Sequence, residues 1–201
     1  MKRLSFLLAI VAAFTIAGSA FAAPPAANPA KNPLQCGGSE GAFTLISKSA
    51  CLFDVEPGEI AYAYYGATGR FYPANAWDQP LGSITQLSFK YTGDVASGGS
   101  PRFSLQIDPD GYTGAVDCGA IEDPCSYALI PAETCNNGAG LVDVINDPTC
   151  LITYQGVTYD NWADFIAGSG LEDASLYFAF VIADSPGTWT VSNIKIGKPG
   201  A

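Results

Sequence analysis

Aromatic side chains are concentrated between Tyr62 and Trp77, in a segment interrupted by glycine and proline. An exposed ring can stack on the C–H face of a sugar, and neighbouring charged groups can bond the sugar hydroxyls. This chemistry indicates a glycan-binding site, for which the candidate side chains are Tyr64, Tyr65, Arg70, Tyr72, Trp77 and Asp78. The alternative is core packing, because alternation along a strand puts Tyr62 and Tyr64 on one face and Tyr65 on the other. At least one of these sets would then be buried, and Trp77, which has polar neighbours, is the ring expected to be exposed.

A second candidate is the carboxylate-rich turn that contains Asp108 and Asp110. Carboxylate oxygens are the ligands that Ca²⁺ prefers, and Asp117 or Asp184 could complete the set. The spacing departs from an EF-hand loop, which also needs a bidentate Glu at its twelfth position. The alternative is a turn without a cation, because Asp and Gly are ordinary turn residues. A bound calcium ion would be structural and weakly held, as in other extracellular modules.

The composition offers little support for catalysis. The chain has no histidine, which excludes Ser-His-Asp and Cys-His catalysis and zinc sites with imidazole ligands. A glycosidase needs two carboxylates about 5–9.5 Å apart, but with 19 acidic residues some such pair is always available. Pairs such as Glu56 with Glu59, or Glu122 with Asp123, are expected to be solvated loop charges. We therefore assign no catalytic residue, and we expect a non-catalytic protein.

The N-terminus has the pattern of a secretory signal peptide. Two basic residues precede an apolar run from Leu4 to about Ala17, and Ala20-Phe21-Ala22 offers a small-x-small cleavage site. Residues 1–22 are thus the predicted signal peptide, 23–35 a Pro/Ala-rich tether and 36–201 a single domain. No later stretch is long and apolar enough to span a bilayer. The protein is therefore expected to be secreted or periplasmic/extracellular.

The charge of the exported part is strongly acidic. Once the two basic residues of the signal peptide are removed, seven basic residues face 19 acidic ones. Such a surface repels phosphate backbones, so nucleic acid is not an expected partner. It suits cation binding or simply solubility.

All six cysteines lie in the exported part. An even number in an oxidising compartment favours three disulfides over metal ligands. Sequence alone cannot choose among the possible connectivities. Pairing between neighbours is preferred because each bridge would close a short, loop-rich segment: Cys36–Cys51, Cys118–Cys125 and Cys135–Cys150.

Two alternating runs, residues 84–92 and 102–108, are at the centre of the expected architecture. Apolar side chains take every second position in both: Leu87, Phe89, Tyr91, Phe103, Leu105 and Ile107. Strict alternation predicts strands with one buried and one solvated face. The segment between them, residues 93–101, consists of turn formers. We therefore expect an antiparallel hairpin in the heart of a β-sandwich.

The other expected strands are shorter. They cover residues 43–48, 52–55, 59–66, 127–130, 141–145 and 176–183, with a hairpin at 151–159. Structure is expected to begin near Phe43. The strand at 176–183 is apolar on both faces, as a strand covered on both sides would be. In the last strand the alternation slips between Val191 and Ile194, which a bulge at Ser192-Asn193 would explain.

One helix is predicted after residue 159. Asp160 is a good N-cap and Gly168 can end the helix. Trp162, Phe165 and Ile166 form the i, i+3, i+4 stripe of a helix with one buried face. A helix this short closes one end of a β-sandwich and does not define an α/β fold.

The ending Gly-Thr-Trp-Thr-Val-Ser-Asn-Ile-Lys-Ile resembles the final strand of bacterial β-jelly-roll modules of the galactose-binding-like, carbohydrate-binding-module type. The resemblance covers roughly residues 84–196. It implies the jelly-roll type of sandwich, so the expected fold is all-β, an antiparallel β-sandwich of jelly-roll type with the one short α-helix predicted above. It also implies Asn193 as a residue near a structural calcium, which adds to the Asp108 and Asp110 predicted from the turn. The implied activity is glycan binding on the concave face or at the loop rim.

The expected function is non-catalytic binding of an extracellular glycan. The alternative is a structural or adhesive module that contacts surface proteins, which should show a broad apolar patch or an open sheet edge. Arg102, at the start of the second central run, is either a ligand clamp or an outward-facing residue whose stem covers its neighbours.

Overall fold

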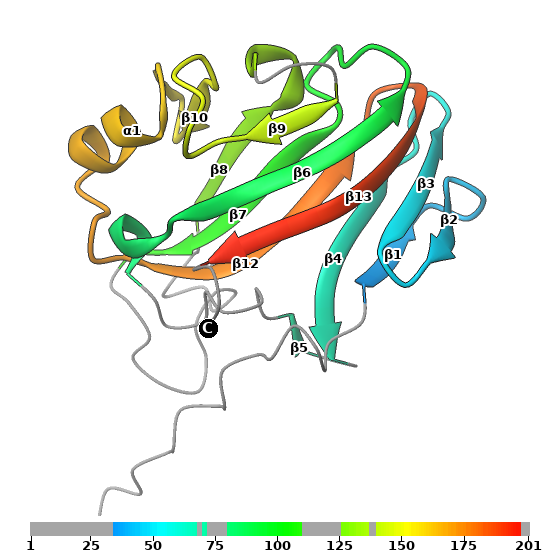
Figure 1. Ribbon diagram of the computed structural model, residues 1–201, viewed down its shortest axis with the longest axis horizontal. Helices are drawn as coiled ribbons and strands as arrows, with labels where there is room; N and C mark the ends of the chain where they lie inside the picture. Colours follow the sequence, from blue (N-terminus) through cyan, green and yellow to red (C-terminus); the bar gives the residue numbers. More distant parts are fainter. Residues whose placement is uncertain (1–33, 68–69, 72–79, 110–125, 137–139, 198–201) are drawn as a thin grey trace, which may run out of the picture.

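Two antiparallel β-sheets pack face to face in the computed structural model (Figure 1). The structure describes residues 34–67, 70–71, 80–109, 126–136 and 140–197. Both sheets bury the apolar side of their alternating strands against each other, which is the arrangement of a β-sandwich.

The larger sheet, called sheet A, has eight strands. Seven of them run side by side in the order β1 (Leu34–Gly38), β4 (Ala61–Ala67), β12 (Ser175–Ala183), β7 (Arg102–Asp108), β8 (Ser126–Pro131), β10 (Ile152–Tyr154) and β11 (Val157–Tyr159). The eighth, β5 (Arg70–Phe71), pairs with β4.

The smaller sheet, called sheet B, has five strands. Their order is β2 (Phe43–Ser47), β3 (Ala50–Val55), β13 (Gly187–Gly197), β6 (Gln86–Gly93) and β9 (Leu141–Asp143). Helix α1 (Trp162–Ser169) and the two 3₁₀ turns, Leu81–Ser83 and Ala132–Thr134, complete the described elements. None of the described helices is long and apolar enough to cross a bilayer.

The chain crosses repeatedly from one sheet to the other, as in a jelly roll. It changes sheet from β3 to β4, from β6 to β7 and from β12 to β13. The last two strands fill the centres of the sheets: β12 lies between β4 and β7, and β13 lies between β3 and β6. The predicted all-β sandwich with one short helix is confirmed.

The predicted central hairpin is wrong. Strands β6 and β7 are both present, but β6 pairs with β13 and β9 while β7 pairs with β12 and β8. The two strands therefore face each other across the core, where the rings of Phe89 and Phe103 meet edge to face at 4.9 Å. Their connection is longer than the two to five residues typical of a hairpin loop, and it turns at Gly98 and Gly99, which both have positive φ. Alternation identifies which face of a strand is buried, but it does not identify the strand's partner. The same face is buried whether the two strands pair in one sheet or face each other from two sheets.

Two disulfides hold the described part together. Cys36 in β1 is bonded to Cys51 in β3, so this bridge links the two sheets. Cys135 is bonded to Cys150, which closes the segment that contains β9. Both pairs are confirmed, and no cysteine in the described residues is free. The third predicted pair, Cys118–Cys125, lies outside the described residues.

Helix α1 begins one residue later than predicted. Its N-cap is Asn161, whose side-chain oxygen accepts a hydrogen bond from the backbone N–H of Asp164 at 3.0 Å. The amide group of Asn161 also donates to the Asp164 carboxylate at 2.7 Å, so the cap is held from both sides. The helix ends at Gly170, which has φ 73°, and not at Gly168. The apolar stripe is confirmed, because Trp162 and Phe165 are buried.

Two further differences concern the ends of the sheets. Strand β1 begins at Leu34, within the predicted tether and well before Phe43, because pairing with β4 and the Cys36 bridge fix this segment. In β13, the register shifts between Ser192 and Lys195, and Asn193 has φ 51°. The bulge predicted from the slip in alternation is therefore confirmed.

Candidate ligand-binding face

Four aromatic side chains gather on the outer face of sheet A. Tyr62 and Tyr64 come from β4, and Phe178 and Phe180 come from the neighbouring β12. Alternation sets their direction, because the residues between them, Ala61, Ala63, Ala179 and Val181, are buried in the core. The four rings, here called the ring cluster, are each only partly buried.

The rings of the cluster contact one another. Phe178 and Phe180 are stacked with centroids 5.0 Å apart, and Tyr62 and Tyr64 lie 5.8 Å apart at 37°. The two pairs meet edge to face, Tyr62 with Phe180 at 6.4 Å and Tyr64 with Phe178 at 5.8 Å. Such contacts fix the rings relative to one another, so a ligand would meet a preformed surface.

A glycine of β1 makes room for the cluster. Gly37 pairs with Tyr62, and a Cβ atom at this position would lie only 2.5 Å from Cε2 of the tyrosine ring. The ring of Tyr62 therefore lies over the backbone of β1. A side chain in place of Gly37 would displace it.

Side-chain amides and hydroxyls border the ring cluster. Gln35 of β1 pairs with Tyr64, whose hydroxyl donates to its side-chain oxygen at 3.4 Å. Burial raises the pKa of the Tyr64 hydroxyl above its ordinary value of 10.0, and the nearby Tyr62 adds to the shift. On β7, Ser104 pairs with Phe180 and Gln106 pairs with Phe178. The face thus combines apolar rings with neutral hydrogen-bonding groups, a combination typical of small-molecule and sugar sites.

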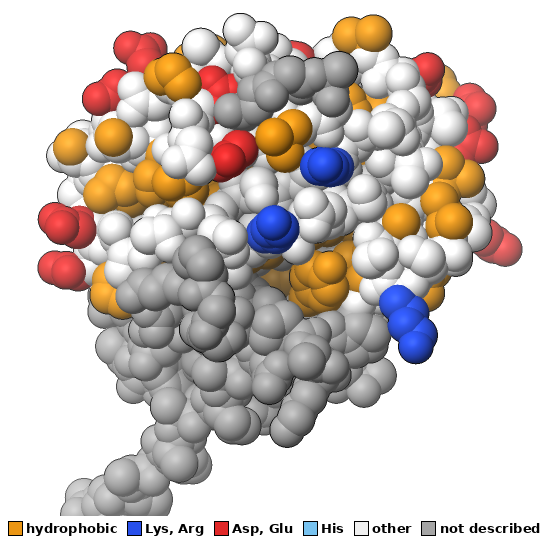
Figure 2. All heavy atoms as spheres, in the orientation of Figure 1, with side chains coloured by type: hydrophobic (Ala, Val, Ile, Leu, Met, Phe, Trp, Pro, Cys, Tyr) orange, Lys and Arg blue, Asp and Glu red, His pale blue; other side chains and the backbone are white. Residues whose placement is uncertain are grey.

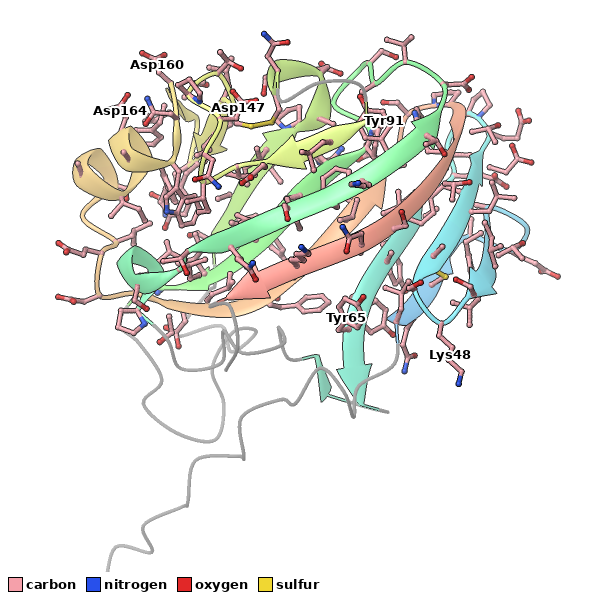
Figure 3. The ribbon with its side chains drawn as sticks, viewed as in Figure 1. Lys48, Tyr65, Tyr91, Asp147, Asp160 and Asp164 are labelled. Carbon is pink, nitrogen blue, oxygen red and sulfur yellow. A yellow bond between two sulfur atoms is a disulfide. The ribbon has the colours of Figure 1, made fainter. Side chains whose placement is uncertain are left out.

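The candidates from the sequence are only partly in this cluster. Tyr64 belongs to it, whereas Tyr65 points to the other side of β4 and packs against the core, and burial raises the pKa of its hydroxyl (Figure 3). Arg70 is in β5, but its side chain is outside the described part of the structure. The remaining three candidates, Tyr72, Trp77 and Asp78, lie outside the described residues.

Sequence reasoning missed Phe178 and Phe180. The strand was expected to be covered on both sides, but these two rings are only partly buried. The available signal was parity: both rings fall on one face of β12, and the small residue between them falls on the other. Their partners on β4 are more than a hundred positions away in the chain, and no local pattern links such strands.

Two of the three predicted calcium ligands, Asp108 and Asn193, lie within the described residues. Asp108 ends β7 in sheet A and is 1% exposed. Asn193 is exposed on the bulge of β13 in sheet B. The two residues are therefore on strands of opposite sheets, and stacked sheets are about 10 Å apart. Asp110 is outside the described residues.

Asp184, another predicted ligand, is held by a different partner. Arg102 forms a bidentate ion pair with it, with both nitrogen–oxygen distances 2.6 Å. The hydroxyl of Ser100 donates to the same carboxylate at 3.2 Å and accepts the backbone N–H groups of Asp184 and Ser185, each at 3.1 Å. This network ties the β6–β7 connection to the β12–β13 connection. The guanidinium of Arg102 is therefore part of the framework at this end of the sandwich, and its side chain is only 14% exposed.

We expect this ion pair to make a small, pH-dependent contribution to stability. The pKa of the Asp184 carboxyl is lowered from 3.8, first of all by the hydrogen bond from Arg102. A carboxyl with a lowered folded-state pKa stabilises the fold above its unfolded pKa, and the contribution is lost as pH falls through the folded value. Because 41% of the Asp184 side chain is exposed, solvent screening should keep the effect below about 1 kcal/mol.

The comparison for this prediction is the urea midpoint of Asp184→Asn against wild type. The wild type should be the more stable at pH 7, and the difference should shrink once the pH falls below about 3.8. A difference that is the same at pH 7 and pH 3 would show that the charge of Asp184 contributes nothing.

One cluster in the described residues has the composition of a metal site, namely Cys135, Asp147 and Cys150. The two sulfur atoms are bonded to each other, so neither is a thiolate. The Asp147 carboxylate accepts the N–H and hydroxyl of Thr149, at 2.9 and 2.7 Å, and the N–H of Asn136. These donors satisfy the carboxylate, which therefore holds Asn136 and Thr149 in place.

The chain matches no protein-family model, and neither a curated protein nor a solved structure matches it.

Proposed function

We propose that this protein is an extracellular, non-catalytic module that binds a glycan chain through the ring cluster on sheet A. The observation that carries the proposal is the placement of four mutually fixed, partly exposed rings on the solvent side of a sheet, bordered by Gln35 and Gln106. A sandwich of this size already buries its rings well elsewhere: Phe53, Phe89 and Phe103 have no exposed surface. Core packing therefore does not require the ring cluster, whereas stacking on sugar rings would explain it.

The chemistry of the border favours a neutral polyhydroxy ligand. The amides of Gln35 and Gln106 and the hydroxyl of Tyr62 can donate and accept, which suits sugar hydroxyl groups. The opposite outer face, over β6 and β13, is different, because it mixes basic, apolar and uncharged polar side chains (Figure 2). Ring stacking is thus best supported on sheet A.

Removing one ring tests the proposal. Tyr62→Ala should weaken retention on the best-bound member of a panel of soluble and insoluble polysaccharides by more than about tenfold, equivalent to about 1.4 kcal/mol. Tyr62→Phe keeps the stacking area and should retain most of the binding. Tyr91→Ala is the matched control, because Tyr91 is also partly buried but packs against the core from β6. It should lower the urea midpoint without a specific loss of binding.

Two outcomes would contradict the proposal. Equal retention of wild type and Tyr62→Ala would place the binding elsewhere on the molecule. A wild type that binds nothing on the panel would favour the second candidate function, a protein-interaction module.

A specific observation supports that second candidate. Strand β2 is an edge of sheet B, and its side chains Leu45 and Ile46 are 52% and 54% exposed. An edge strand offers unpaired backbone groups to which another chain can add a strand. Lys48 follows directly and is a typical protection of such an edge, so we rank this function second.

A further inference from the structure

The outer face of sheet A continues beyond the ring cluster to another aromatic side chain. In the β12–β7 register Phe178 lies opposite Gln106, and in the β7–β8 register Gln106 lies opposite Tyr127. Paired residues point to the same side of a sheet. Phe178, Gln106 and Tyr127 thus form one row across three neighbouring strands, with an amide between two rings.

The ring of Tyr127 is largely exposed on this face. Its strand, β8, pairs with β7 at Tyr127 and with β10 at Ala128 and Leu129, and 47% of Tyr127 is exposed. Among the described residues no ring contact or hydrogen bond of its side chain is found, whereas the next residue, Ala128, is fully buried. Packing against the described residues therefore does not account for an aromatic ring here.

The length of the row sets the size of a ligand that would use it. Neighbouring strands are about 4.8 Å apart, so two strand steps separate Tyr127 from Phe178 by about 10 Å. A single sugar ring is too small to contact both aromatic side chains. A chain of several sugars that runs across the strands would contact the ring cluster, then Gln106, then Tyr127.

We propose that Tyr127, with Gln106, forms a second subsite of the glycan-binding face, and that the ligand is an oligosaccharide or polysaccharide chain lying across β4, β12, β7 and β8. This inference rests on the proposed function. It adds that affinity grows with chain length, because a ligand gains the Tyr127 contact only when it extends past the ring cluster.

The test is a length series of one to six sugar units, prepared by partial hydrolysis of the polysaccharide that the wild type retains best. For wild type, affinity should rise with length. Tyr127→Ala should lose at least about tenfold in affinity for the longest member and nothing for the shortest member that still binds. Tyr127→Phe should keep the length dependence. The exposed Val157→Ala, on the edge strand β11 of the same sheet, is the control and should leave every member unchanged.

The outcomes separate the subsite from the binding function itself. If Tyr127→Ala weakens the whole series equally or not at all, the second subsite is wrong, while Tyr62→Ala still reports on the ring cluster. If no polysaccharide is retained by the wild type, the proposed function fails and this inference fails with it. A wild type whose affinity is the same for all lengths also overturns it.

Discussion

Trp189→Ala should lower the free energy of unfolding by about 3–5 kcal/mol, the usual cost of removing a fully buried aromatic side chain. Trp189 is 1% exposed and lies on β13, between β3 and β6 at the centre of sheet B. Its ring packs so closely on Gly187 that a Cβ atom there would be 2.4 Å from the ring. Its indole N–H donates to the backbone oxygen of Asp94 at 3.0 Å. Truncation removes the packing and leaves that oxygen without this donor.

Two companion variants locate the source of this loss. Trp189→Phe keeps a large ring but cannot donate a hydrogen bond, so it should lose less than the alanine variant. Thr190→Ala changes the next side chain, which faces outward, and should stay within about 0.5 kcal/mol of wild type. The free energies come from urea unfolding without reductant. An equal loss for Trp189→Ala and Thr190→Ala would mean that the centre of sheet B is not the packed core described above.

The features of the fold that depend on local sequence patterns could be predicted. Alternation correctly identified the strands around Phe89 and Phe103 and their buried faces, and the slip of parity in β13 correctly located the bulge. What alternation cannot supply is the partner of each strand. The two central strands bury the same side chains whether they pair as a hairpin or face each other across two sheets, and only contacts distant in sequence decide.

The candidate site was less predictable for the same reason. Tyr64 was identified because it lies in a segment of the sequence that is rich in aromatic residues. Phe178 and Tyr127 were not, since they reach the same face only through the pairing of β4, β12, β7 and β8. The calcium ligands stay a prediction: Asp108 and Asn193 belong to strands of opposite sheets, and Asp110 lies outside the described residues.

Asp147→Ala is expected to have the second largest effect on stability, a loss of about 2–4 kcal/mol. Asp147 is 3% exposed, and its carboxylate accepts hydrogen bonds from the backbone of Asn136 and from the N–H and hydroxyl of Thr149. Hydrogen bonds to a charged group contribute about 1.5–3 kcal/mol each, and donors left unsatisfied add to the cost. The expected loss of stability is smaller than the sum of these hydrogen-bond contributions. Asn136 and Thr149 are at the surface, so water can replace part of the lost hydrogen bonding.

The measurement is again the urea midpoint under non-reducing conditions, so that Cys135–Cys150 continues to close the loop around Asp147. Asp54→Ala is the matched control, because Asp54 is exposed and its carboxylate accepts the hydroxyl of Thr188 at 2.8 Å. It should lose no more than about 1 kcal/mol. If the two variants lost the same amount, the loop between the two cysteines would not unfold together with the sandwich. A larger loss at Asp147 means that one buried carboxylate joins this loop to the cooperative unit, since the disulfide is present in both proteins.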